Sequence, residues 1–337
     1  MWTVDGSRGE GGGQVLRTAL TASLLKQEPI RVRDIRKNRS KPGLLPSHLA
    51  AVRAAVAVSG GRAIGDDLRS TEIEFHPGPL RPGAHTFAIG TAGSTTLVLQ
   101  TVLLPVLEHG GSFELSLEGG THNPKAPPFD FLARTYVPLL RTLGARIEVN
   151  LERVGFAPRG GGAFTARIEA GGDFRGEVAL EERGVVRSTR VRSLLSHLPE
   201  HIAERQIARL EGRLMPRPSE ARVESIDGAG PGNVVMIEVE SEALTEIFTA
   251  FGRRHVAAEQ VADEVWSEAI FYLESRAVVG PHLADQLVPI MALRQRGGFL
   301  TVYPTLHTHT QVELVNELLD TSIRIDEIDP KTWRIGY

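Results

Sequence analysis

Residues 299–315 read FLTVYPTLHTHTQVELV and contain, in order, the parts from which this chain is built. The first five residues are apolar, aromatic or β-branched, which predicts a strand, and Pro304 ends it. Apolar residues recur at roughly helical spacing from Gln311 onward, with His307 and His309 between the two elements. The stretch therefore predicts a strand, a polar junction and a helix.

Two interpretations of the junction histidines are open. A strand-to-helix junction faces the amide end of the helix, which favours anions. A neutral imidazole, with an unperturbed pKa of about 6.5, is also a nucleophile at pH 7. In the other interpretation, His307 and His309 are exposed loop residues or helix caps.

The composition is that of a globular protein. The 337 residues are 41% hydrophobic and 23% charged, and they can bury a large core. The apolar run 97–107 contains Gln100 and is too short to span a bilayer, and we expect no signal peptide at the start MWTVDGSRGE. Without cysteine there is no disulfide or thiolate metal site, and a cytoplasmic location fits. A net charge of −3 argues against coating of bulk nucleic acid, but leaves room for one basic site.

Glycine-rich turns between a strand and a helix occur near the start and again near residue 90. In the first, strand 3–5 leads through residues 6–14 into an apolar helix, and in the second, strand 87–89 leads through GTAGS into helix 95–107. Such turns bring backbone amides against phosphate, or they are tight turns in which glycine adopts positive φ. Four glycines within residues 9–13 surround Glu10, which could hold a hard divalent cation.

The most basic stretch follows the second strand. A solvated loop and a phosphate-binding loop are both open interpretations of it. Its cations are Arg31, Arg33, Arg36, Lys37, Arg39 and Lys41, and Asp34 is its one acid.

The chain organisation predicted from these patterns is an α+β array of three similar units with one interruption. The predicted domains are a large domain over 1–184, an inserted small domain over 185–275, and the remainder of the large domain over 276–337. Within the insertion we expect a helix at 201–210 and a strand at 233–239. Two further helices are expected there, around 242–251 and 257–273.

With these segments identified, the chain resembles the RNA 3′-terminal phosphate cyclase family over about residues 5–319. Each segment alone is weak, but eight in this order are very specific. They are DGSRGEGGGQVLR (5–17), RKNRSKPGLL (36–45), GTAGSTTLVLQ (90–100), GGTHNPKAPPFDF (119–131), GFAPRGGG (155–162), GAGPGN (228–233), HLADQL (282–287) and the segment around His307.

The resemblance implies a fold and an activity. The implied fold has three repeated units of two helices packed on a four-stranded sheet, with a small thioredoxin-like α/β domain inserted. The implied activity is ATP-dependent conversion of an RNA 3′-terminal phosphate to a 2′,3′-cyclic phosphate. A histidine takes AMP from ATP and passes it to the RNA end, which then cyclises.

The resemblance also implies roles for individual residues. His307 matches the adenylylated histidine, with His309 auxiliary, and Glu10 matches an acid near the Mg²⁺ or Mn²⁺ ion. His282 stands where the family often has Tyr, and Ser47 where Gln is common. The remaining matches are Gln100, His282, Leu283, Ala284, Asp285 and Gln286 for ATP, and Arg36, Arg39 and Lys41 for the substrate phosphate.

The chemistry visible in the sequence agrees with a histidine nucleophile. No lysine follows a glycine, so there is no Gly-Lys-Ser/Thr phosphate loop, and none stands two residues before Asp-Gly as in the common ligases. The expected partner is an RNA with a 3′-terminal phosphate, with no membrane, and a homodimer is left open. Two rival functions are a catalytically inactive cyclase-like protein of ribosome assembly and an enolpyruvyl-transferase-like enzyme.

Overall fold

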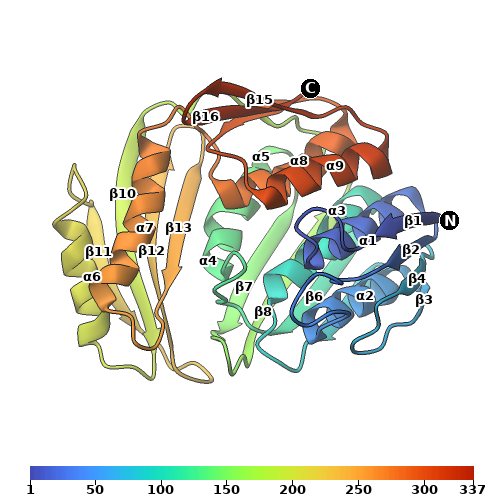
Figure 1. The fold of residues 1–337 in the computed structure, drawn as a ribbon, viewed down its shortest axis with the longest axis horizontal. Helices are drawn as coiled ribbons and strands as arrows, with labels where there is room; N and C mark the ends of the chain where they lie inside the picture. Colours follow the sequence, from blue (N-terminus) through green and yellow to red (C-terminus); the bar gives the residue numbers. More distant parts are fainter.

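The computed structural model describes residues 1–337, and its first unit is a four-stranded sheet covered by two helices (Figure 1). The strand order is β1-β2-β4-β3, with β1 and β2 parallel and the other pairs antiparallel. The elements are β1 (Trp2–Asp5), α1 (Gly13–Lys26), β2 (Ile30–Arg33), α2 (Pro46–Ser59), β3 (Arg62–Ile64) and β4 (Ile73–His76).

The second unit repeats this topology in the order β5-β6-β8-β7. Its second helix is continuous from Phe129 to Thr142 but passes through one π-helical segment. The elements are β5 (Gly83–Ala88), α3 (Thr95–His109), β6 (Gly111–Gly119), α4 (Phe129–Phe131), the π-helix η1 (Leu132–Tyr136), α5 (Val137–Thr142), β7 (Ile147–Arg153) and β8 (Gly162–Ala170).

The third unit has the order β15-β16-β14-β9, and its first strand is separated from the rest by the insertion. The elements are β9 (Ala179–Leu180), α8 (Pro281–Arg294), β14 (Gly298–Thr301), α9 (Leu306–Leu319), β15 (Arg324–Asp329) and β16 (Thr332–Gly336). These three units and the α/β insertion confirm the predicted fold class.

The insertion forms a fourth sheet, in the order β11-β10-β12-β13, with two helices packed on it. Figure 1 shows it at the left, where β13 contacts α4 and η1 of the second unit. The predicted domain borders at residues 184 and 275 remain predictions. The elements are β10 (Val186–Ser196), α6 (His201–Glu211), β11 (Glu220–Ser225), β12 (Gly232–Ser241), β13 (Thr245–Phe251) and α7 (Ala258–Leu273).

The helix expected at 242–251 is wrong, because this segment is strand β13. The hydroxyl and backbone of Ser241 bond to Leu244, closing a tight turn that returns the chain antiparallel to β12. Both faces of β13 are buried, so its apolar residues do not alternate with polar ones. Their spacing then imitates a helix.

The helix of the opening stretch begins one turn earlier than the apolar pattern indicated. Thr305 is its N-cap and accepts a hydrogen bond from the Thr308 amide, so His307 lies in the first turn of α9 rather than in a loop. The predicted strand is shorter, because pairing with β16 ends at Thr301. Buried threonines on the first turns, Thr308 and Thr310, hid the helical period.

The helices of the three units pack against one another. Helix α1 contacts both α3 and α9, and α8 contacts α9, so the N-terminal ends of helices from different units meet. One large apolar cluster runs through all three units, and a smaller one lies mainly in the insertion. No helix is both long enough and apolar enough to cross a membrane.

Candidate active site

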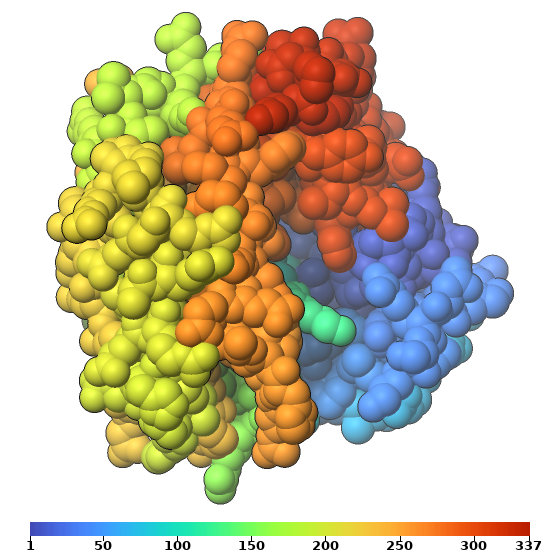
Figure 2. All heavy atoms as spheres, turned by 60° about the vertical axis from the view of Figure 1, so that its left-hand side comes forward, coloured from blue at the N-terminus to red at the C-terminus, as the bar shows by residue number.

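A cleft of about 570 Å³ lies where the three units and the inserted domain meet. Figure 2 shows the hollow between the first unit in blue, the third in red and the inserted domain in orange. One wall carries residues of α1, α8 and α9, among them Gln14, Asp285 and His307. The opposite wall is made by residues 124–127 of the second unit and by β13 and α7 of the insertion.

The first glycine-rich turn closes tightly against α9. Gly9 and Gly11 have φ angles of +56° and +59°, which favour glycine, and a Cβ on Gly9 would come within 2.2 Å of the Thr310 hydroxyl. A Cβ on Gly13 would come within 2.4 Å of the buried His48 ring. Helix α1 begins at Gly13 without a side-chain cap, so its first amides remain available to an anion.

His307 is held so that one ring nitrogen carries the proton and the other is free. Nδ1 donates a hydrogen bond to the side-chain amide oxygen Oε1 of Gln14 at 3.1 Å, which leaves the Nε2 lone pair available. The side chain is 53% exposed, and Nδ1 lies 4.0 Å from Oε2 of Glu10. His307 lines the cleft, and its Nε2 makes no hydrogen bond within the protein.

Glu10 holds a buried carboxylate with one unused oxygen. Its side chain is 4% exposed, and its backbone N–H donates to the Thr310 hydroxyl at 3.0 Å. Arg39 donates to Oε2 and to the backbone carbonyl, whereas Oε1 is buried with no hydrogen-bond partner. A buried carboxylate oxygen without a partner is unfavourable unless something binds there.

The donor set fits a hard divalent cation that shares its ligands with a phosphate. No group of three or more His, Asp and Glu side chains gathers around one point. Mg²⁺ is commonly held by only one or two carboxylates together with waters and substrate phosphates. Glu10 Oε1 suits such a site, because it is anionic, oriented and otherwise unpaired.

Two further charged groups lie along the same wall. Asp285 accepts a hydrogen bond from the Thr308 hydroxyl at 2.7 Å, and burial raises the pKa of its carboxyl to about 7, with the Glu10 charge adding to the rise. Burial lowers the pKa of Arg17 to about 10, although the charges of Glu10 and Asp285 oppose that change. Arg17 thus remains cationic at neutral pH and lines the cleft.

The cleft brings together some of the predicted site residues and leaves others aside. Gln100, His282 and Gln286 line it with Asp285, and Gln286 donates to the His282 carbonyl at 3.1 Å. Leu283 and Ala284 are buried behind this surface. Of the basic loop, Arg39 lines the cleft but Arg36 and Lys41 do not; Arg36 donates to the Lys41 carbonyl at 2.8 Å. His309 is exposed and does not line the cleft.

Sequence reasoning missed two groups of cleft residues. Gln14, Arg17, Thr18 and Thr21 form a polar stripe along the otherwise apolar helix α1, and that spacing was a readable signal. Thr308 belongs to the predicted junction without a role of its own, yet its hydroxyl donates a hydrogen bond that positions Asp285. The residues from the inserted domain carried no comparable signal in the sequence; they are Thr249, Phe251 and Glu268.

Comparisons with known proteins agree with this arrangement. The family model described as RNA 3′-terminal phosphate cyclase matches residues 8–325. An RNA 3′-terminal phosphate cyclase from Koribacter versatilis is 44% identical over 328 residues, which cover 97% of this chain and 92% of that protein. Proteins of the same name from Salmonella agona and Pseudomonas fluorescens are 43% and 45% identical, each over 96% of this chain and over 94% and 95% of their own lengths.

Proposed function

Because the chain belongs to the RNA 3′-terminal phosphate cyclase family, we propose that it converts the 3′-terminal phosphate of an RNA to a 2′,3′-cyclic phosphate at the expense of ATP. The products are the cyclic RNA end, AMP and pyrophosphate. The observation that supports the proposal is the state of His307, which lines the cleft and whose Nδ1 is occupied by Gln14, so that Nε2 is left without a partner in the protein.

In the first step, Nε2 of His307 attacks the α-phosphorus of ATP. A nitrogen–phosphorus bond forms as the bond to pyrophosphate breaks, and the Nδ1 proton stays on the ring. The ring becomes positively charged as this bond forms. The Glu10 carboxylate, 4.0 Å from Nδ1, stabilises that charge. The side-chain amide oxygen of Gln14 keeps the ring oriented.

Two further transfers complete the reaction. An oxygen of the RNA 3′-phosphate attacks the AMP phosphorus, the bond to His307 breaks and the imidazole is regenerated. The neighbouring 2′-hydroxyl then attacks the 3′-phosphorus, AMP leaves, and the hydroxyl proton is released. Each transfer needs in-line positioning and charge stabilisation more than acid–base groups.

The wall that carries His307 supplies positive charge for these steps. Arg17 and Arg39 line the cleft, and the first amides of α1 have no side-chain cap, so they suit phosphate oxygens. A divalent cation held at Glu10 would neutralise phosphate charge. Gln100, His282 and Gln286 line the same cleft, and we assign them to the adenosine of ATP.

The proposal is tested with matched oligonucleotides that end in a ribose or a 2′-deoxyribose 3′-phosphate. With ATP and Mg²⁺ or Mn²⁺, the ribose end should be converted to a cyclic phosphate. The deoxyribose end has no 2′-hydroxyl and should stop as the adenylylated strand. A cyclic product from the deoxyribose end, or no adenylylated strand at all, would contradict this route.

A second measurement separates an enzyme from an inactive RNA-binding relative. The protein is incubated with ATP labelled in the α-phosphate, in the absence of RNA. Acid-labile, histidine-linked label is the expected result, whereas a binding protein acquires none. An enolpyruvyl-transferase-like enzyme would also remain unlabelled, because that chemistry does not use ATP.

A further inference from the structure

The cleft wall opposite His307 consists of two segments that are far apart in the sequence. Residues 124–127 belong to the loop before α4, and Thr249 and Phe251 belong to β13 of the inserted domain. The size and shape of the cleft therefore depend on how the inserted domain rests against the second unit. Met236, Ile247 and Phe251 of the insertion join the main apolar cluster, and buried charges cross the same interface.

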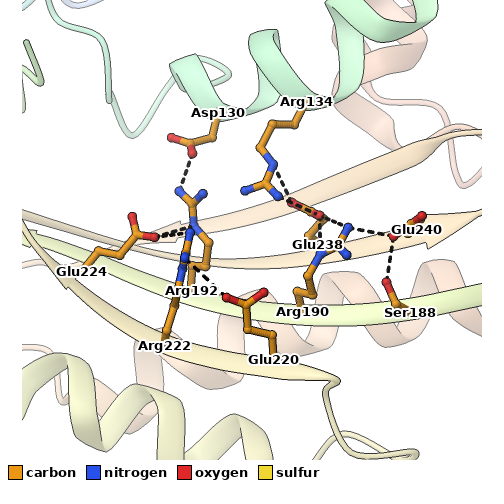
Figure 3. A network of polar contacts seen from close by, with 10 residues as sticks. All are labelled: Asp130, Arg134, Ser188, Arg190, Arg192, Glu220, Arg222, Glu224, Glu238 and Glu240. Carbon is orange, nitrogen blue, oxygen red and sulfur yellow. Dashed lines mark hydrogen bonds and ion pairs between the residues drawn. The ribbon is translucent and has the colours of Figure 1, made fainter. Parts of the chain in front are cut away.

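Asp130 connects the loop before α4 to the inserted domain through one carboxylate. Its Oδ2 accepts a hydrogen bond from Nε2 of His122 at 2.8 Å, and Oδ1 accepts one from Arg192 of β10 (Figure 3). His122 is fully buried and lies two residues before the cleft-lining segment. Its Nδ1 bonds to the Thr121 hydroxyl at 2.9 Å, which in turn accepts from the Gly155 amide.

The charge state of Asp130 suits this double role. Burial alone would raise the pKa of its carboxyl, but the hydrogen bond from His122 and the charge of Arg192 hold the pKa at about 2. The carboxylate is therefore ionised at neutral pH. It reaches the cleft loop on one side and the inserted domain on the other.

A second contact crosses the same interface with the charges reversed. Arg134 of η1 pairs with Glu238 of β12 at 2.9 Å, and Glu238 is also bound by Arg190 of β10 at 2.6 Å. The second unit thus contributes an acid and a base, and the inserted domain contributes the complementary base and acid (Figure 3). A small cavity lies between the two pairs.

Crossed pairs of this kind determine position more than they add stability. Removing ions from water offsets most of the attraction between them, so a well-packed apolar contact would stabilise the interface as well. Hydrogen-bonded pairs, however, are satisfied in only one relative placement of the two bodies. A displaced inserted domain would leave Asp130 with only His122 and Glu238 with only Arg190, each short of one partner in a buried position.

We infer that Asp130 is a positioning residue for the nucleotide cleft, which couples the seating of the inserted domain to the loop that forms the wall opposite His307. Nucleotide in the cleft and the seated inserted domain then stabilise each other reciprocally. This inference rests on the proposed function, because the nucleotide is ATP. Asp130 itself does not line the cleft, so it acts through the two segments it holds.

The test measures self-adenylylation against ATP concentration in the whole protein. Asp130→Asn should raise the half-saturating ATP concentration about tenfold and change the maximal rate less than about threefold. Adding Arg192→Met to Asp130→Asn should not raise the half-saturating ATP concentration further, because the two substitutions remove the same ion pair. The matched control is Asp263→Asn, which removes a carboxylate bound by Arg209 and Arg213 on the far side of the inserted domain and should leave the value unchanged.

If Asp130→Asn folds poorly, Arg134→Met provides a second variant for the same measurement. The Arg134 side chain is one-third exposed, and Glu238 keeps Arg190 as its partner, so this variant should fold and should raise the half-saturating concentration about threefold. A purely structural role for Asp130 would lower the melting temperature and leave ATP saturation unchanged. That outcome, or an additive effect of Arg192→Met, would overturn the inference.

Hydrogen exchange provides the readout that a structural role would not change. In the unsubstituted protein, a non-hydrolysable ATP analogue should slow exchange in the 121–123 segment and also in β10, which does not line the cleft. In Asp130→Asn the protection of β10 should disappear. An unsubstituted protein that takes no label from ATP would instead refute the proposed function, so the two failures are distinguishable.

Discussion

The two walls of the cleft are held in different ways. On the His307 wall, contacts between α1 and α9 are hydrogen bonds that fix single atoms, such as Nδ1 of His307 on Gln14 and the Glu10 amide on Thr310. On the opposite wall, buried ion pairs fix whole bodies, as Arg192 with Asp130 does. The first arrangement decides where a lone pair and a proton lie, and the second decides how wide the site is. Chemistry and shape are therefore assigned to separate contacts.

Substitution of His307, the proposed nucleophile, should have the largest effect of any change on the two walls. His307→Ala should abolish AMP labelling, a loss of at least about a thousandfold, because the variant lacks the ring nitrogen that is proposed to accept AMP. His309→Ala is the matched control. It should lower labelling without abolishing it, because His309 does not line the cleft. Labelling is measured on the intact protein after incubation with ATP. Full labelling of His307→Ala would show that His307 is not the residue that accepts AMP.

Glu10→Ala should have the next largest effect. It removes the unpaired buried oxygen, so adenylylation should fall about a hundredfold and recover partly at higher Mn²⁺ concentration. Glu313→Ala is the control, because Glu313 is exposed and pairs only weakly with Arg8. Titration of metal against labelling rate provides the measurement. A metal dependence identical to that of the unsubstituted protein would exclude Glu10 as a ligand.

Arg39→Ala tests whether the His307 wall also receives the RNA end. Use of a 3′-phosphorylated RNA should fall about tenfold, and the dependence on salt should weaken because one phosphate contact is lost. Adenylylation should also fall, since Arg39 holds Glu10 in place. Lys41→Ala is the comparison, because Lys41 lies on the same loop but off the cleft wall, and it should change both values less.

The smallest expected effect lies on the other wall, at the buried Glu246 of β13. Burial raises the pKa of its carboxyl from 4.5 to about 8, and its Oε2 accepts from the Gly280 amide at 2.9 Å. Between these values the folded protein keeps a proton that the unfolded chain has lost, so stability falls as pH rises from 4.5 to 8. Glu246→Gln should remove that fall.

The measurement is the melting temperature of both proteins at several pH values. The advantage of Glu246→Gln over the unsubstituted protein should grow from pH 5 to pH 8, reaching about 2 to 4 °C, and then level off. Glu240→Gln, a more exposed glutamate on the neighbouring strand, is the control and should give no such rise. Parallel curves for the two proteins across this range would show that Glu246 is ionised when folded.

Much of the architecture could be predicted from local patterns. The glycine-rich turns, the apolar helices after them and the repeated order of elements predicted the three units correctly. The strand β13 could not be predicted, because burial on both faces erased the alternation that marks a strand. The start of α9 was misplaced because its first turns bury threonines instead of apolar residues.

The sequence by itself determined which side chains are the candidates for the chemistry, because short motifs place His307, Glu10 and Gln100 at the ends or on the faces of predictable elements. Only the tertiary structure decided their states: Gln14, 293 residues away, selects the free nitrogen of His307. It also decided the opposite wall, where Asp130 meets Arg192 and Thr249 and Phe251 reach the cleft. Local patterns report how one segment folds, whereas a cleft between four bodies depends on contacts between segments that no local pattern records.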